Sequence, residues 1–350
     1  MQEEKKVSVK DIASALHISL STVHKALTGK TGISDTRRQQ VLQTAREMGY
    51  CVNTVAQTLS RKHLTIGVIL PNHWQEFFSP MKQGIVAQLA ELEGQKVVGV
   101  YYEIPPVPES REAARLQSWI EAEKPDAILY CASHYAINAL ALPVLQGSGC
   151  PFFWVGGSAD QQKGSISSIT VDGGLTGRLA ADFLSCARGN ALRAAVFTGS
   201  VKIPVHKAKT DAFCQRTEEN GGKLLAVCQT EDDPEKTRTE FEALLETCKD
   251  LNGVYVSTAT SEPVCRVIRE RGLQNSITLV GTDLFDVLTD YMKQGIIKAT
   301  VNQNQEEVGR LAVRTAYEYL HKTSSYGTTH WRPERQLLVK PELLLKANVE

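Results

Sequence analysis

The chain has 350 residues, more than one hydrophobic core usually serves, which predicts two or three domains. Its 42% hydrophobic and 22% charged residues are ordinary for a folded protein and argue against general disorder. The 39 basic and 39 acidic residues cancel, but residues 1–62 carry ten Lys or Arg against five Asp or Glu, and the rest carries 29 against 34. A basic head on an acidic body predicts a polyanion-binding module joined to a body with another task.

Several classes of protein are disfavoured by what the sequence lacks. No apolar run approaches the ~20 residues of a membrane span, and the first residues lack the apolar segment of a signal peptide, so we expect a cytoplasmic protein. The eight cysteines are scattered without a Cys-x-x-Cys pair, which predicts reduced thiols and no zinc site. No phosphate loop, Gly-x-Ser-x-Gly elbow or His-Glu-x-x-His motif occurs. We therefore expect no enzyme, no cofactor and no metal.

Three short helices are predicted at the start of the chain. Apolar residues recur at helical spacing from Val9 to Leu16 and again from Val23 to Leu27, and a third helix follows the capping pair Ser34-Asp35. The tight turn at residues 17–19 makes the first two helices the outline of a helix-turn-helix. In that motif the second helix enters the major groove and its first residues reach base edges.

The candidate DNA contacts divide into base readers and phosphate contacts. Lys25 has a donor for guanine O6 and N7, Ser21 can donate or accept, and Leu20 offers an apolar surface to a thymine methyl. The candidate base contacts are Leu20, Ser21, Thr22, His24 and Lys25, and the candidate phosphate contacts are Lys10, Lys30, Arg37 and Arg38. The alternative is a three-helix domain whose basic face serves only solubility.

An ordered series of residues near the start of the chain resembles the lactose-repressor family. The series is Val9, Asp11-Ile12-Ala13, Ile18-Ser19, Thr22-Val23, Lys25, Gly49-Tyr50, Asn53, Ala56, Leu59 and Ile66-Gly67-Val68. The family usually has Ser-Arg after Thr-Val, where this chain has His24-Lys25, so its operator need not follow the family's common sequence. The usual Arg-Pro before Asn53 is Cys51-Val52.

The resemblance implies that residues 53–63 form a hinge. Its residues 53–61, a segment of roughly nine residues, are too few to form a stable helix alone, and family members fold theirs on DNA. There paired hinge helices push a leucine into the minor groove, which implies this role for Leu59, with Asn53 and Ala56 as neighbouring contacts. The alternative is a plain linker, although the stretch Ala-Gln-Thr-Leu at residues 56–59 lacks the Gly, Ser and Pro expected of one.

After residue 64, apolar strands alternate with amphipathic helices. Strands are expected near 64–70, 96–102, 126–131, 152–155, 166–171, 193–198, 223–228, 253–257, 278–281 and 298–301, with helices near 79–93, 109–123, 135–147, 206–220, 234–248, 261–272 and 285–294. Such alternation implies parallel sheets covered by helices. Two series imply two doubly wound α/β subdomains with a ligand cleft at the strands' carboxyl ends.

The predicted domains follow from these patterns. Residues 1–52 form the helix-turn-helix head and residues 53–63 the hinge, and residues 64–350 form an effector-binding domain. Within it we expect a first subdomain of about 64–187 plus 303–322 and a second of about 188–302 plus 323–350. The fold class is therefore an α head followed by an α/β body.

The body resembles periplasmic sugar-binding proteins of the ribose-binding kind, as the effector domain of the repressor family does. The matching residues are Val171-Asp172-Gly173, Gly177-Arg178-Leu179-Ala180, Phe197-Thr198-Gly199-Ser200, Gly281-Thr282-Asp283, Ala299-Thr300-Val301, Gln303 and Gly309. The resemblance implies that Asp283 accepts sugar hydroxyls and that Gln303 supplies an amide. Lys209 stands where relatives usually have an effector-binding Arg, which loses the bidentate geometry.

Further effector contacts are expected beside these three. They are His206, Asn72, Trp74, Phe77, Phe78, Trp154, Asp172 and Thr258. Residues 72–78 match the family least, because Asn72 and Gln75-Glu76 replace its usual Asp and Asn-Pro. The alternatives are structural: Asp283 capping the next helix, Gln303 bonding a strand, and Trp154 packing in the core.

Together these features predict a homodimeric regulator of transcription, most simply a repressor, that binds a near-palindromic DNA operator. A small sugar or polyol is the expected effector. A phosphorylated metabolite, a nucleobase or a protein partner is the alternative, and either release or recruitment of DNA by the effector fits the pattern.

Overall fold

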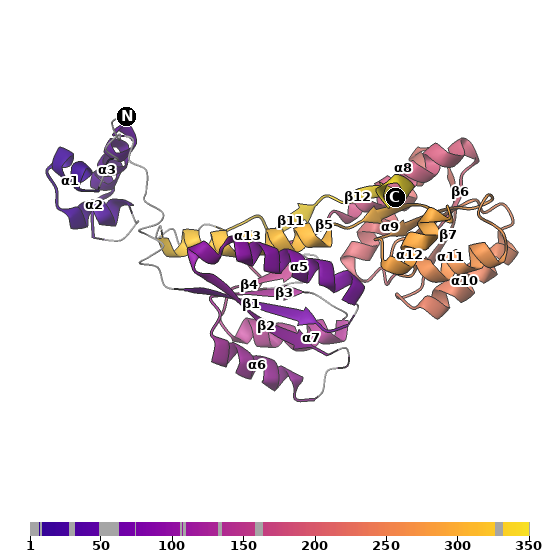
Figure 1. Cartoon of the computed structure of the whole chain (residues 1–350), viewed down its shortest axis with the longest axis horizontal. Coiled ribbons are helices and arrows are strands. Elements are labelled where there is room, and N and C mark those ends of the chain that lie inside the picture. The colour runs from indigo at the N-terminus through magenta and orange to yellow at the C-terminus, as the bar shows by residue number, and fades with distance from the viewer. Residues whose placement is uncertain are drawn as a thin grey trace.

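The computed structural model describes residues 7, 9–27, 32–48, 63–73, 75–105, 107, 110–131, 135–157, 164–325 and 332–349. These residues form a small helical headpiece followed by two α/β subdomains (Figure 1). The predicted hinge with Asn53, Ala56 and Leu59, and the candidates Lys30 and Trp74, lie outside the described residues. Within the described part of the chain, no helix is long and apolar enough to cross a membrane.

The headpiece is the predicted set of three helices, α1 (Val9–Leu16), α2 (Leu20–Leu27) and α3 (Asp35–Glu47). Its core consists of the buried residues Ile12, Ala13, Val23, Ala26, Val41 and Ala45. The chain reverses between α1 and α2 at His17, whose φ of 50° is left-handed. The backbone nitrogen of Ile18 then donates to the carbonyl of Ala13 at 3.0 Å, which closes α1 as a Schellman-type end.

The first subdomain is built on a sheet in the order β11-β5-β4-β3-β1-β2, in which every described pair of strands is parallel. The strands are β1 (Leu64–Pro71), β2 (Val97–Ile104), β3 (Ala127–Cys131), β4 (Phe152–Val155), β5 (Ser168–Val171) and β11 (Gln336–Val339). The helices are α5 (Gln75–Glu91), α6 (Glu112–Glu123), α7 (Tyr135–Gly147) and α13 (Gln305–Ser325), with the short turn η1 (Glu93–Gln95).

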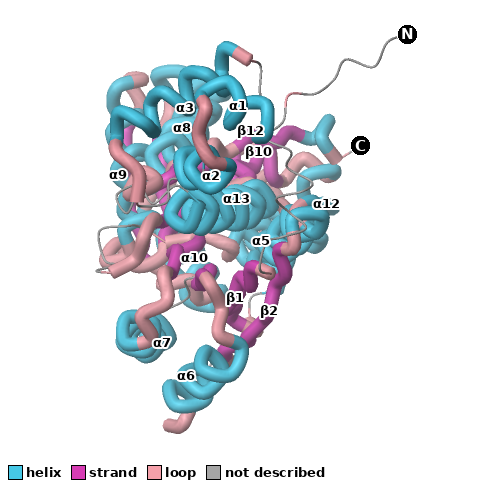
Figure 2. The backbone as a smooth tube through the Cα atoms, turned by 90° about the vertical axis from the view of Figure 1, so that its left-hand side faces the viewer, coloured by secondary structure: helices cyan, strands magenta, loops and turns pink. Residues whose placement is uncertain are grey.

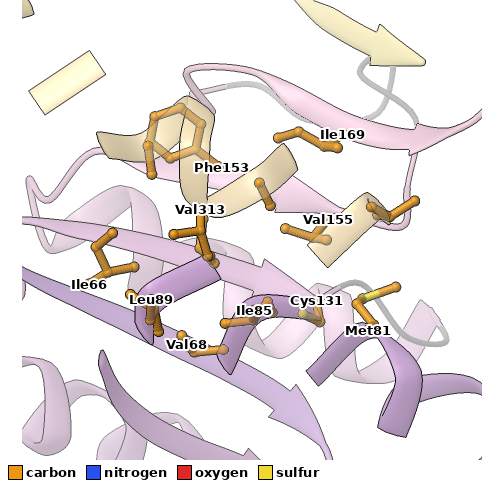
Figure 3. Close-up of a cluster of buried hydrophobic side chains, with 14 of the residues drawn as sticks. Ile66, Val68, Met81, Ile85, Leu89, Cys131, Phe153, Val155, Ile169 and Val313 are labelled. Atoms are coloured by element: carbon orange, nitrogen blue, oxygen red, sulfur yellow. The ribbon is translucent and has the colours of Figure 1, made fainter. Parts of the chain in front are cut away.

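Helices α5 and α13 lie side by side over one face of this sheet (Figures 1 and 2). The core between them and the sheet includes Ile66, Ile85, Phe153 and Val313 (Figure 3). Residues of opposite parity on the same strands, such as Ile128, Tyr130 and Trp154, belong to a second core with α6 and α7. The alternation of strand side chains between two faces produces these two layers.

The second subdomain repeats the plan with the strand order β12-β10-β9-β8-β6-β7. The strands are β6 (Arg193–Thr198), β7 (Lys223–Gln229), β8 (Gly253–Val256), β9 (Thr278–Thr282), β10 (Ile297–Asn302) and β12 (Glu342–Leu345), which is antiparallel to β10. The helices are α8 (Gly173–Arg188), α9 (Pro204–Glu219), α10 (Pro234–Thr247), α11 (Ser261–Glu270) and α12 (Asp286–Lys293), with the turns η3 (Gly189–Ala191) and η4 (Lys346–Asn348).

Two segments lie in the other subdomain from the one predicted. Helix α8 packs against α9 and the second sheet, although residues up to 187 were expected in the first subdomain. Strand β11 pairs with β5 of the first sheet, although residues 323–350 were expected in the second. The chain therefore passes between the subdomains at residues 171–173, 302–305 and 339–342. The third passage separates the short strands β11 and β12, which the sequence pattern did not predict.

Candidate functional site

The exposed face of α2 carries most of the predicted base contacts. Leu20 is 47% exposed, and Ser21 and His24 are also exposed. Ser19 caps the helix, because its Oγ accepts from the backbone nitrogen of Thr22 at 3.1 Å, and the two hydroxyls share a second hydrogen bond. Thr22 is therefore half-buried and engaged at the cap, which limits it to a supporting part in base readout.

The basic residues around this face differ in exposure. Lys25 is half-buried, and its Nζ lies 3.4 Å from the position that a Cβ on Gly32 would occupy, so its side chain folds back over Gly32. Lys10 and Arg37 are exposed, with Arg37 donating to Gln40 at 3.0 Å. Arg38 is half-buried. Among the described candidate phosphate contacts, Lys10 and Arg37 are thus better placed than Arg38.

The carboxyl ends of the second sheet gather polar side chains. Thr198 ends β6, Ser257 follows β8, Thr282 ends β9 and is followed by Asp283, and Gln303 follows β10. Because these strands are parallel, their carboxyl ends lie along one edge of the sheet, where open α/β folds bind ligands. This edge, which we call the cleft edge, also receives the first turns of α9 and α13.

Asp283 and Gln303 form a tight pair at the cleft edge. The backbone nitrogen of Gln303 donates to Asp283 Oδ1 at 2.9 Å, and its Nε2 donates to Oδ2 at 2.6 Å. Burial raises the pKa of Asp283, while the hydrogen bonds from Gln303 and Gln305 and the charge of Lys209 oppose that rise. Asp283 has a left-handed φ of 59°, a conformation rare for residues other than glycine and often found where backbone strain serves a site.

Lys209 extends this pair to α9. Its Nζ donates to Gln303 Oε1 at 2.6 Å and to the carbonyl of Ser257 at 3.3 Å, and its side chain is buried. Burial lowers the pKa of Lys209 from its ordinary 10.5 to about 8, although Asp283 and Asp232 favour the charged form. The sequence prediction that Asp283, Gln303 and Lys209 share one site is therefore met in geometry, and their roles toward an effector stay a prediction.

Hydroxyl groups fill the space behind Lys209. Thr198 Oγ1 accepts hydrogen bonds from Thr210 Oγ1 and Ser257 Oγ, each at 2.9 Å, and all three residues are buried. Thr258 shares a 2.8 Å hydrogen bond with Thr260, which also receives one from Thr237. Thr258 is thus a member of a buried hydroxyl network rather than a side chain open to the cleft.

A further acid lies at the outer end of the cleft edge. Asp232 follows β7, and its Oδ2 lies 3.7 Å from Nε2 of His206 on the first turn of α9. Burial, with the charge of Lys209, lowers the pKa of His206 to about 3, so the imidazole is neutral at physiological pH. Burial raises the pKa of Asp232.

The space between the subdomains at this edge is a cavity of about 20 Å³, room for about one water molecule. It is lined by Phe77, Met81, Gly156, Thr170, Val171, Val205, Gln303, Gln305 and Val308. Entry of a ligand as large as a sugar ring requires the subdomains to move apart, because pockets for such molecules usually measure ≈ 300 Å³ or more.

The comparisons with known proteins agree with this architecture. The periplasmic binding protein domain family matches residues 66–324. The chain belongs to this family. A glucose-galactose binding protein from Geobacillus stearothermophilus has a similar fold, with a TM-score of 0.68 and 18% identity over 82% of this chain and 99% of that one. A protein described as a LacI transcriptional regulator from Bacteroides fragilis has a TM-score of 0.66 and 15% identity over the same shares.

The N-terminal part has curated relatives of another kind. Catabolite control protein A of Priestia megaterium is 34% identical over 80 residues, which is 23% of this chain and 24% of that protein. The transcriptional repressor CytR of Escherichia coli K12 is 33% identical over 85 residues, or 24% and 25% of the two chains. These alignments span about a quarter of the relatives' length and bear out the resemblance to lactose-repressor-type regulators over the first ~80 residues. The relatives are regulators, in line with a chain predicted not to be an enzyme.

Within the binding-protein domain, several predicted effector contacts lie away from the cavity. Phe78 is buried in the core under α5, and Trp154 is buried on the opposite face of the first sheet, stacked edge-on against Tyr130. Asp172 caps α8, since its Oδ1 accepts from the backbone nitrogen of Leu175 at 2.8 Å. Asn72 is exposed after β1 and does not line the cavity. Phe77 does line it.

The binding-protein domain also holds site residues that the sequence reading missed. Gln305 begins α13 and lines the cavity, and Asp232 approaches His206. Both follow a strand of the second sheet by a few residues, so a search for polar residues just beyond each strand end would have found them. Asp232 stands in the run Thr230-Glu231-Asp232-Asp233-Pro234, which resembles an ordinary helix start, and Asp233 does cap α10.

Proposed function

We propose that this chain is a DNA-binding regulator of transcription, most simply a repressor, that acts as a homodimer in the cytoplasm under the control of a small-molecule effector. The observation that carries the proposal is the presence, on one chain, of a helix-turn-helix headpiece and a periplasmic binding protein domain. The named relatives of the head are transcription regulators, which supports the same assignment.

The effector-binding part of the proposal rests on the cleft edge. Asp283, Gln303 and Lys209 combine a carboxylate that accepts, an amide that donates and accepts, and an ammonium that donates, the set that recognises a polyhydroxylated ligand. Effector entry would open the cavity and change the angle between the subdomains, and with it the spacing of the two heads in a dimer. Coupling of this kind is reciprocal, so DNA and effector change each other's affinity by the same factor.

A selection on genomic DNA fragments with the full-length protein tests the proposal. A near-palindromic site should be enriched. The negative slope of log affinity against log salt concentration should be several units in size, at ~0.9 per neutralised phosphate. The isolated residues 1–62 should bind the same site much more weakly, since two linked heads act together. Absence of any bound DNA, or binding without salt dependence, would contradict the proposal that the chain is a DNA-binding regulator.

A further inference from the structure

Asp232 is a mostly buried acid without a hydrogen bond among the described residues. Its side chain is 23% exposed, and its nearest basic side chain is His206, with 3.7 Å between Oδ2 and Nε2, beyond hydrogen-bond range. Asp232 and its neighbour Glu231 both have left-handed φ values, of 60° and 58°. A buried carboxylate is costly unless a cation or donors compensate it, so this geometry leaves a partner to be supplied.

His206 does not neutralise that carboxylate. Its imidazole is uncharged at physiological pH because burial and Lys209 lower its pKa to about 3. Its Nδ1 is buried without a hydrogen-bond partner among the described residues. Gly199 forms the wall behind the pair: a Cβ there would lie 2.8 Å from Asp232 Oδ2 and 2.9 Å from His206 Nε2. The absence of a side chain at Gly199 therefore lets the acid and the imidazole sit against the end of β6.

The charges along the cleft edge do not balance. His206 and Lys209 lie three residues apart on α9, and the charge of Lys209 acts on both Asp283 and Asp232. Two carboxylates and one ammonium leave one negative charge when both acids are ionised. The described residues of the first subdomain that line the cavity contribute no charge; they are Phe77, Met81, Gly156, Thr170, Val171, Gln305 and Val308. A cationic group on the ligand would balance that charge.

We infer that Asp232 and His206 form a subsite for a protonated amine, so that the effector is an amine-bearing polyol of the amino-sugar class. The inference rests on the proposed function and deepens its effector site. An ammonium donates a charge-assisted hydrogen bond to Asp232 and another to a neutral imidazole nitrogen of His206, and it restores neutrality. A neutral sugar supplies only hydroxyls there, and a phosphorylated ligand adds repulsion beside Asp232.

Calorimetry of the full-length protein with matched sugars tests this inference. The probes are D-glucose with D-glucosamine, D-galactose with D-galactosamine and D-mannose with D-mannosamine, at about pH 6.5, where such amines are largely protonated. At least one amine should bind about tenfold more tightly than its hydroxyl twin. Asp232→Asn should remove that preference, and Glu231→Gln, the adjacent and 69% exposed acid, should keep it. No preference in any pair, no binding by any amine, or a preference that survives Asp232→Asn would overturn the inference.

Thermal unfolding separates a ligand subsite from a structural role. Asp232→Asn removes a buried charge without a hydrogen-bonded partner, so the Tm of the unliganded protein at neutral pH should stay equal or rise. A clear fall in Tm would show that the acid stabilises the fold and would overturn the subsite. The DNA selection is independent of both measurements. If the protein binds DNA but shows no preference for amines, only this inference fails. If it binds no DNA, the regulator proposal fails.

Discussion

Gln303 holds the carboxylate of Asp283 with two hydrogen bonds while its own carbonyl accepts from Lys209. The three side chains thus connect the end of β9, the passage after β10, and helix α9 of the second subdomain. In the closed arrangement these polar groups satisfy one another. An entering ligand must exchange these hydrogen bonds for its own, so its affinity reflects the difference between two bonded sets rather than the sum of new contacts.

Asp283→Asn should weaken effector binding at least about tenfold, about 1.4 kcal/mol or more, because a hydrogen bond to a charged group contributes ~1.5–3 kcal/mol. The same change should lower the Tm. In the variant, the NH2 group of the new Asn side chain would face Gln303 Nε2, which is also a donor. If the Gln303 amide flipped to offer its oxygen to that NH2 group, its Nε2 would face the donor Lys209 Nζ instead. Calorimetry with a sugar that the wild-type protein binds measures the affinity, and thermal unfolding measures the Tm. Unchanged affinity would show that the carboxylate does not contact the effector.

Lys209 should make stability depend on pH in the alkaline range. Burial lowers its pKa to about 8 in the folded chain, against about 10.5 when unfolded. Between these values the unfolded chain holds a proton that the folded chain has released, so raising the pH stabilises the folded state relative to the unfolded one. Urea unfolding of the wild type and of Lys209→Met should show the wild type gaining on the variant from pH ~8 to ~10.5. Parallel pH curves for the two proteins would contradict a buried, depressed lysine.

The sequence predicts the elements that are driven by local pattern. Strands β4 and β6 and helix α7 have the predicted bounds, because each is a continuous or periodic apolar run. Helix α8 was not predicted, since it begins Gly173-Gly174 and is fixed by its packing on α9. Strands β11 and β12 are four residues each, and their placement depends on partners far along the chain.

The site was predictable where a residue type and a strand end coincide. Asp283 and Gln303 each follow a strand of the second sheet, and the structure brings them together. Phe78 and Trp154 lie in hydrophobic cores rather than at the cavity, because the position of Phe78 depends on how α5 turns and that of Trp154 on the side of β4 from which it projects. A shift of one residue along a strand moves a side chain from one face of the sheet to the other, and the core on either face can hold an aromatic side chain.

In the headpiece, Lys25→Ala should cost about 1–3 kcal/mol at the cognate operator and relax the preference at one base pair per half-site. Because Lys25 lies over Gly32, its side chain must swing outward to reach a base. Arg37→Ala is the matched control: as an exposed phosphate contact it should weaken all sequences alike and reduce the salt slope by about one unit. Equal losses of Lys25→Ala on cognate and random DNA would assign Lys25 to the phosphates.

Gly177→Ala should destabilise the second subdomain and weaken effector binding together. A Cβ at Gly177 would lie 2.1 Å from the carbonyl oxygen of Lys209 and 2.8 Å from the backbone nitrogen of Phe213, so α8 and α9 must separate. Overpacking of this kind costs about 1–3 kcal/mol, and the residue displaced is Lys209 itself. Gly147→Ala, at the end of α7 with nothing within 4 Å, should be neutral or stabilise by ~0.4–1 kcal/mol. Urea unfolding and calorimetry measure both variants. If Gly177→Ala behaves like Gly147→Ala, the close approach of α8 and α9 does not set the position of Lys209.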